Sequence, residues 1–260
     1  MPNSINPSPF NETRQPQGYF SLNREHPLAA GLVANYPFSG PGAGHPKRGV
    51  KLRDYSGYEH HGQWVQAYGG SSTSGYIFTE KGWVFDFDGQ NDYFSALHTE
   101  KLSIDKEITI SAWINVDQFK NQVILSKGGT SGGADNINYG FRLGGGLSAS
   151  EGSSNFKKLS FLMQDASHPG VVEFMSSSDV ITSTSTWYHV AIKFNFGNTT
   201  EDPIGGPASP GGGYDYDPSS AKLFVNGNFV PGSWSNIGFG TAHLTGYSLW
   251  IWMDARNGGV

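Results

Sequence analysis

The sequence predicts an all-β fold, a two-sheet antiparallel jelly-roll sandwich, and three observations lead to this expectation. Glycine accounts for 36 of the 260 residues and aromatic residues for 14%, a composition typical of aromatic-rich strands joined by tight turns. Short apolar runs recur between turn signals along most of the chain. No segment has the residue spacing of a long amphipathic helix.

Eleven segments have the composition of short strands. In chain order, the expected strands span residues 31–38, 83–87, 92–96, 108–116, 122–127, 139–144, 158–164, 171–177, 186–196, 221–230 and 247–253. The Asn-Gly pair inside VNGN (225–228) predicts a tight hairpin turn within the tenth of these segments.

Two of these segments alternate clearly between the two faces of a strand. In ITISAWINV (108–116) the apolar residues Ile108, Ile110, Ala112, Ile114 and Val116 are separated by Thr109, Ser111, Trp113 and Asn115. In TWYHVAIKFNF (186–196) the set expected to face the core is Tyr188, Val190, Ile192, Phe194 and Phe196. Each strand should therefore bury one face and expose the other.

The length fits one large β domain, so we expect a single sandwich over residues 23–260. Residues 1–22, rich in Pro, Asn, Ser and Gln, are expected to form an N-terminal arm that a partner could order; a loose tail is the alternative. The Gly- and Pro-rich stretch 197–220 is expected to be a long surface excursion, and 128–138 a shorter loop.

Composition excludes several classes of function. The formal net charge is −5 and the densest basic run is HPKR at 45–48, so nucleic-acid binding through phosphate contacts is not expected. The absence of cysteine rules out disulfides and thiolate metal sites. No apolar run reaches membrane-spanning length. The N-terminus has no secretory pattern and begins with Met1, which favours another route to the protein's destination.

Seven motifs, in order along the chain, resemble the laminin G-like jelly-roll domains of the concanavalin A-like lectin/glucanase fold. They are GLVANYPFSG (31–40), RDYSGYEHHG (53–62), WVFDFDGQNDYFSA (83–96), ITISAWINV (108–116), VILSKGG (123–129), STSTWYHVAIKF (183–194) and AKLFVNGNFV (221–230). The resemblance covers roughly residues 30–255 and implies the sandwich fold. It implies less about function, because this fold carries lectins, adhesion modules, enzyme accessory domains and virion proteins.

The sequence departs from the family pattern in two places. The excursion at 197–220 replaces a short turn, and the family's closing Ile-Asp-x-Val-like strand is missing after ARNGGV. Either the sequence is truncated or that strand is supplied otherwise, for instance by residues 1–30 or by a neighbouring chain. NREHPL (23–28) is similar to a segment that opens domains of this kind in phage-encoded proteins.

No catalytic pattern is present, so we expect no enzyme activity. Laminarinase-like relatives on this fold carry two glutamates flanking an aspartate on one strand, and retaining glycosidases need two carboxyl groups about 5 Å apart. Glu107, Glu151 and Glu173 are isolated in sequence, and Asp86 with Asp88 is more typical of a hairpin end. No Gly-x-Ser-x-Gly motif supports serine hydrolase chemistry.

Calcium is the metal that the residue types would suit, and the resemblance adds to this expectation. Asp54 is the first candidate ligand, and Asp88 and Asp92 are the others. The favoured alternative is structural, with Asp54 making an Asx-turn near Ser56 and both other aspartates belonging to a hairpin turn. His60 and His61 are adjacent, so an extended strand would send them to opposite faces and they would not chelate one ion together.

Sugar binding would need an aromatic platform with a few polar groups. The candidates are Trp64, Tyr68, Trp83, Trp250 and Trp252, of which the last two share one face of a strand. The alternative is that these rings are core residues, because large aromatic side chains dominate sandwich interiors.

The sequence therefore predicts a non-catalytic laminin G-like protein that binds or assembles. The first class is a virion surface component, such as a phage capsid decoration or tail-associated protein, that could also bind glycans. The second is a secreted or cell-surface carbohydrate-binding or adhesion module. Expected partners are other virion or surface subunits, glycans and further copies of the chain, with no nucleic acid and no membrane insertion. The expected location is the virion surface or the extracellular space.

Overall fold

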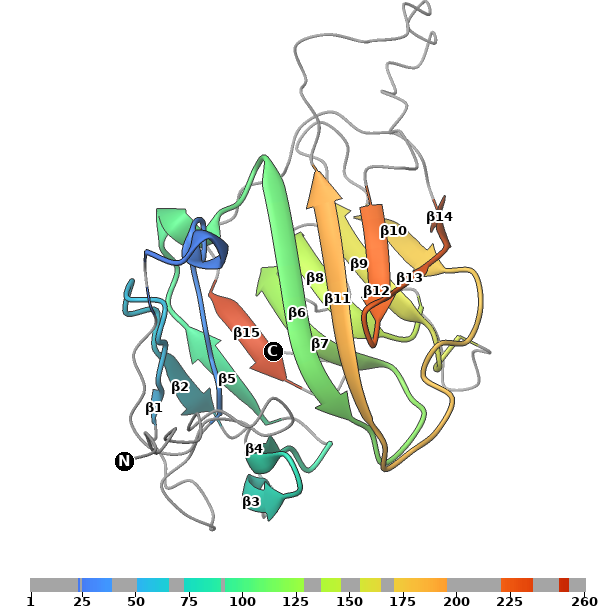
Figure 1. Cartoon of the computed structure of the whole chain (residues 1–260), viewed down its shortest axis with the longest axis horizontal. Coiled ribbons are helices and arrows are strands. Elements are labelled where there is room, and N and C mark those ends of the chain that lie inside the picture. Colours follow the sequence, from blue (N-terminus) through green and yellow to red (C-terminus); the bar gives the residue numbers. More distant parts are fainter. Residues whose placement is uncertain are drawn as a thin grey trace, which may run out of the picture. The chain divides into compact units, whose positions relative to one another are not determined.

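The computed structural model describes residues 23, 25–38, 51–65, 73–89, 92–128, 137–145, 155–164, 171–195, 221–235 and 248–252. Within these residues the fold is nearly all β, with antiparallel sheets in a sandwich arrangement and two short 3-10 turns (Figure 1). This confirms the fold class expected from the sequence. The chain divides into two compact units, Met1–Ala96 and Leu97–Val260.

The first unit contains one 3-10 turn and five short strands. They are η1 (Pro27–Ala29), β1 (Lys51–Leu52), β2 (Gly62–Val65), β3 (Gly75–Thr79), β4 (Gly82–Asp86) and β5 (Tyr93–Ala96). Strand β2 pairs with β1 and with β5, and β3 pairs with β4 as a separate hairpin, all antiparallel.

Aromatic rings fill the interior of this unit, and Phe85 on β4 lies among them. Its ring centroid is 4.9 Å from Trp64, 4.9 Å from Phe94 and 5.1 Å from Tyr76. The pairs with Phe94 and Tyr76 are edge-to-face, and such pairs add to the stabilisation that comes from burying the rings themselves. Burial raises the pKa of Tyr76 to about 12, with a smaller contribution from Tyr55.

The second unit contains η2 and ten strands, which form two antiparallel sheets. The elements are η2 (Glu100–Leu102), β6 (Glu107–Asn115), β7 (Gln122–Gly128), β8 (Ile137–Leu143), β9 (Leu159–Gln164), β10 (Val171–Ser176), β11 (Trp187–Asn195), β12 (Ala221–Val225), β13 (Asn228–Val230), β14 (Gly232–Ser235) and β15 (Leu249–Trp252). One sheet has the order β13-β12-β11-β6, and the other includes β15-β7-β8-β9-β10-β14. In Figure 1 the four-stranded sheet lies in front of β7–β10.

The core of the second unit lies between these two sheets, as the alternation in the sequence predicts. On β11, Val190, Ile192 and Phe194 are fully buried. The Phe194 ring contacts Phe161 of the facing sheet at 5.2 Å between centroids and Trp234 at 5.5 Å. The intervening residues of β11 face away from this core.

The hairpin predicted at VNGN is confirmed. Strand β12 ends at Val225 and β13 begins at Asn228, which leaves a two-residue turn in which Asn226 has φ 50° and Gly227 has φ 79°. Positive φ at both positions is what a tight hairpin of this hand requires, and Asn-Gly adopts it readily.

The strand expected at 31–38 is wrong, because this segment pairs with no described strand and is held instead by side chains and the Tyr55 backbone amide of the loop 53–61. The carbonyl of Val33 accepts a hydrogen bond from His60 Nδ1 at 2.9 Å and lies 3.1 Å from Ser56 Oγ. The Asn35 amide donates to Asp54 Oδ1 at 2.8 Å. This segment is therefore extended chain held by the 53–61 loop.

Strands β1, β2, β3 and β14 were not expected from the sequence. Strands β1, β2 and β14 have two to four residues and no apolar run that would mark them, whereas β3 does contain the apolar run Tyr76–Phe78 and was missed. The predicted arm at 1–22 and the excursion at 197–220 lie outside the described residues, as does most of the loop at 128–138.

Candidate ligand-binding face

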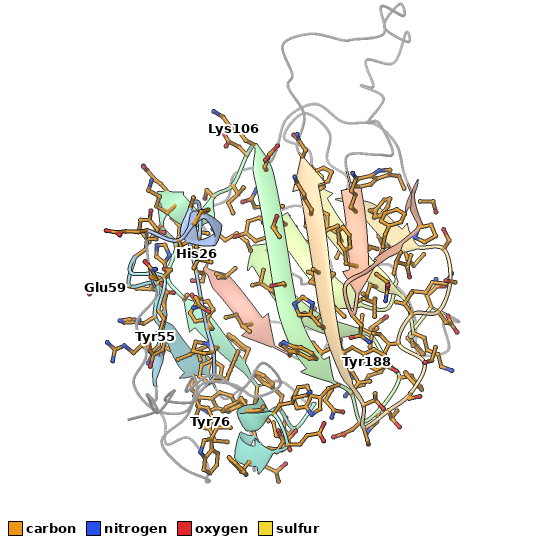
Figure 2. The ribbon with its side chains drawn as sticks, in the orientation of Figure 1. His26, Tyr55, Glu59, Tyr76, Lys106 and Tyr188 are labelled. Carbon is orange, nitrogen blue, oxygen red and sulfur yellow. The ribbon has the colours of Figure 1, made fainter. Side chains whose placement is uncertain are left out.

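Asp54 lies in the loop 53–61, where its carboxylate accepts four hydrogen bonds. Oδ1 accepts from the amides of Asn35 at 2.8 Å and Ser56 at 2.9 Å, and Oδ2 accepts from Ser56 Oγ at 2.6 Å and the His60 amide at 3.1 Å. The bond to the Ser56 amide is the Asx-turn expected as the structural alternative. Figure 2 shows Tyr55 and Glu59 on the same loop.

The adjacent histidines use their Nδ1 atoms in opposite ways. Nδ1 of the buried His60 lies 2.9 Å from the Val33 carbonyl, so this nitrogen carries the proton and donates. Nδ1 of His61 instead accepts from the Asp54 amide at 3.1 Å. The two rings thus hold different parts of the backbone.

Asp88 and Asp92 are joined through Ser74. The Ser74 hydroxyl donates to Asp92 Oδ2 at 2.7 Å and accepts from the Asp88 amide at 2.8 Å. Asp92 is buried, so this bond ties the start of β5 to the segment before β3. The hairpin turn expected here is wrong, because β4 pairs with β3 and β5 pairs with β2, so the segment that carries Asp88 and Asp92 connects strands that do not pair with each other.

Among the described residues, no three His, Asp or Glu side chains are grouped as a metal centre would need. The carboxylate of Asp54 has about four acceptor directions, and protein donors already occupy them. A calcium ion at Asp54 would have to displace at least one of these donors. The calcium role of Asp54, Asp88 and Asp92 stays a prediction.

The aromatic residues predicted to bind sugars lie in different settings. Trp64 is 3% exposed and packs among the core rings of the first unit, so its faces are covered and the stacking role expected for it does not fit. Trp83 on β4 is partly exposed and contacts the exposed Phe78 at 5.4 Å. Tyr68 lies outside the described residues. Trp250 and Trp252 belong to β15, and Trp250 is the register partner of Ser126.

The isolated carboxylates do not form a catalytic pair within the described chain. Glu107 accepts a hydrogen bond from Asn195 Nδ2 at 3.0 Å on the surface. Glu173 is buried against Arg142, with Nη2 and Oε1 3.0 Å apart. Burial lowers the pKa of Arg142, and Glu173 opposes that shift. Glu151 lies outside the described residues.

The outer face of the four-stranded sheet exposes a group of aromatic side chains that the sequence-based site prediction missed. Trp113 on β6 is 58% exposed, and Phe229 on β13 is 59% exposed. His189 on β11 is the register partner of Trp113, with 5.3 Å between ring centroids. Phe224 on β12 contacts Phe229 at 6.1 Å. We call these four residues the aromatic face.

Two small residues share the outer face with the aromatic side chains. Ala191 is the register partner of Ser111 on one side and of Phe224 on the other. Cross-strand partners point to the same side of a sheet, so these three residues share the outer face. The short side chains of Ala191 and Ser111 therefore lie on this face in the row of Phe224, next to the row of Trp113 and His189.

The turn Asn226–Gly227 fixes the edge of this face. The backbone amide of Asn226 donates to the His189 carbonyl at 2.7 Å, and the Asn226 Oδ1 accepts from the His189 backbone amide at 2.9 Å.

The signal for the aromatic face was present in the sequence, because Trp113 falls among the polar residues of ITISAWINV. Its neighbours come from distant segments, and only the register of β6, β11, β12 and β13 brings them together.

No described helix is long and apolar enough to cross a membrane. The comparison with curated proteins gives no match. A family model described as the concanavalin A-like lectin/glucanases superfamily, of the laminin G type, matches residues 63–201, more than half of the chain. Four of the seven sequence motifs lie inside this range. The protein therefore belongs to the laminin G-like family of the concanavalin A-like lectin/glucanases superfamily.

Proposed function

We propose that this protein is a non-catalytic carbohydrate-binding module and that the aromatic face is its sugar site. Membership of the family suggests a binding or lectin-type module, although the superfamily also includes some glycosidases. The observation that carries the proposal is the exposure of Trp113 beside His189 on a regular sheet. An exposed ring held by flanking strands offers a flat apolar surface, with polar side chains beside it to accept and donate hydrogen bonds.

The arrangement of polar groups fits a sugar better than a purely apolar partner. Ser111 and Asn115 lie two residues on either side of Trp113, on the same face of β6. Asn226 lies at the turn beside His189, where its Oδ1 accepts a hydrogen bond from the His189 amide. Hydroxyl and amide groups near a stacked ring can bond sugar hydroxyls and so provide specificity.

The setting that we propose first is the surface of a virion, where the protein would be a decoration or tail-associated subunit that also binds glycans. Its support is the resemblance of NREHPL (23–28) to openings of phage-encoded domains, together with an exposed aromatic surface suited to contacts. A secreted or cell-surface module is the second setting. Sedimentation of the full chain tests the choice between these two settings. Assembly with further copies of the chain is expected for a virion subunit and not for a secreted or cell-surface module.

A glycan array tests the sugar site directly. The full chain should bind a defined set of glycans, and Trp113→Ala should weaken that binding by about tenfold or more, since a central aromatic contact commonly carries this much affinity. Phe78→Ala is the matched control, because Phe78 is 64% exposed but lies on the β3–β4 hairpin. Unchanged binding by Trp113→Ala, or equal losses in both variants, would remove the aromatic face as the site.

A further inference from the structure

Beside the aromatic face, two lysines lie directly opposite each other on the same side of the sheet. Lys193 on β11 is the register partner of Lys222 on β12, and both side chains are exposed. No ion pair to either lysine occurs in the described part of the chain. Like charges at directly opposed positions of an antiparallel pair destabilise it. An anion placed between the two ammonium groups would remove this repulsion.

The positive charge on this face is local: it comes from the two lysines, and the residues around them are neutral or acidic. The chain as a whole has a formal net charge of −5. The next row of the sheet carries Glu107 opposite Asn195, and the Glu107 carboxylate accepts the Asn195 amide hydrogen bond at 3.0 Å. Thr109, the other neighbour of Lys193, is neutral. Two adjacent cations in such surroundings can hold one acidic group of a ligand, whereas a nucleic acid would need a broad basic surface.

The lysines continue the aromatic face along the strands. Lys222 is two residues from Phe224 on β12, and Lys193 is two residues from Ala191 on β11. Successive residues on one face of a strand are about 7 Å apart, so the lysine row is about 13 Å from the Trp113–His189 row. In Figure 2 the label of Lys106 marks the end of β6 nearer the lysines, and the label of Tyr188 marks the opposite end of the sheet.

We propose that this face binds an acidic oligosaccharide, with sugar rings against the aromatic face and a carboxylate or sulfate group between Lys193 and Lys222. The inference rests on the proposed sugar-binding function and specifies its substrate class. The separation of the two rows requires a ligand of several sugar units that runs along β11. The anion is held by two charge-assisted hydrogen bonds, which also select against neutral glycans of the same shape.

Titration calorimetry with three probes tests this substrate class: oligogalacturonate, a sulfated dextran oligosaccharide and a neutral gluco-oligosaccharide. One of the two acidic probes should bind more tightly than the neutral one, and which of them does so identifies carboxylate or sulfate as the anion. Lys193→Gln and Lys222→Gln should each weaken acidic binding by about 2- to 5-fold, the usual range for exposed charge pairs. Added salt should weaken it as well.

Arg53→Gln is the control, because it removes the same charge from an exposed residue of the first unit and should leave binding unchanged. If the neutral probe binds as tightly as the acidic ones and the lysine variants are unaffected, the acidic-ligand inference fails while the sugar site stands. If acidic probes bind but Trp113→Ala has no effect, the aromatic site fails. If no probe and no arrayed glycan binds, both proposals fail.

Discussion

Nζ of Lys127 lies 3.0 Å from Nδ1 of His98, although the lysine has no exposed surface. Burial lowers the pKa of Lys127 from 10.5 to about 8. In the unfolded chain the same amine stays protonated up to its ordinary pKa. Between about pH 8 and pH 10.5 the unfolded state therefore binds more protons than the folded state, and this residue makes folding more favourable as the pH rises.

The pH dependence of stability should reveal this lysine. Lys127→Met keeps most of the side-chain volume without an amine. The melting temperature of the wild type should therefore rise relative to that of the variant as the pH rises from 8 to 10. Comparing the two proteins at each pH cancels the effect of Tyr76, whose raised pKa disfavours the folded state above pH 10. A difference that is constant over this range would contradict a depressed lysine pKa.

Replacing Asp54 should destabilise the first unit. Asp54→Ala leaves the buried donors of Ser56 and His60 without their acceptor, which is expected to cost about 2–4 kcal/mol in the free energy of unfolding. Urea unfolding, monitored by tryptophan fluorescence, measures this loss in the free energy of unfolding. The loss should be the same in EDTA and in calcium, because the donors are protein groups. A wild-type melting temperature that rises with calcium, while that of the variant does not, would instead establish Asp54 as a calcium ligand.

The buried pair of Arg142 and Glu173 should respond very differently to one substitution and to two. Glu173→Ala leaves a buried guanidinium without its carboxylate and should cost about 3–5 kcal/mol. Arg142→Met combined with Glu173→Leu removes both charges and should recover much of that loss. Denaturant midpoints of the three proteins measure the coupling. A double variant that is no more stable than Glu173→Ala would show that the two residues do not act as a pair.

The two sides of the four-stranded sheet should be separable by mutation. Phe194→Ala opens a cavity beside Phe161 and Trp234 and should cost about 3–5 kcal/mol. Trp113→Ala, on the exposed side, should change stability by only about 0.5 kcal/mol. Thermal unfolding of both variants gives the comparison. A large loss for Trp113→Ala would mean that this ring serves the fold and not a ligand.

The alternation of apolar and polar residues was sufficient to predict which side of β6 and β11 is buried. Successive side chains of a strand point to opposite faces, so the sequence of the strand itself contains this information. It also placed Trp113 on the polar side. It did not predict the aromatic face, because the partners of Trp113 are set by strand order and register. The segment 31–38 was mistaken for a strand for a similar reason: Ser56 and His60, which hold the Val33 carbonyl, come from a loop whose path the sequence does not show.

Strand β11 has one further consequence. Its inward residues hold the sandwich together, whereas Ala191, His189 and Lys193 contribute little to the interior. Substitutions at the outward positions can therefore accumulate without loss of folding, and relatives with the same core can differ in what they recognise. A library randomised at Ser111, Trp113, His189, Ala191, Lys193 and Phe224 should stay folded, which makes this sheet a scaffold for selecting binders of new specificity.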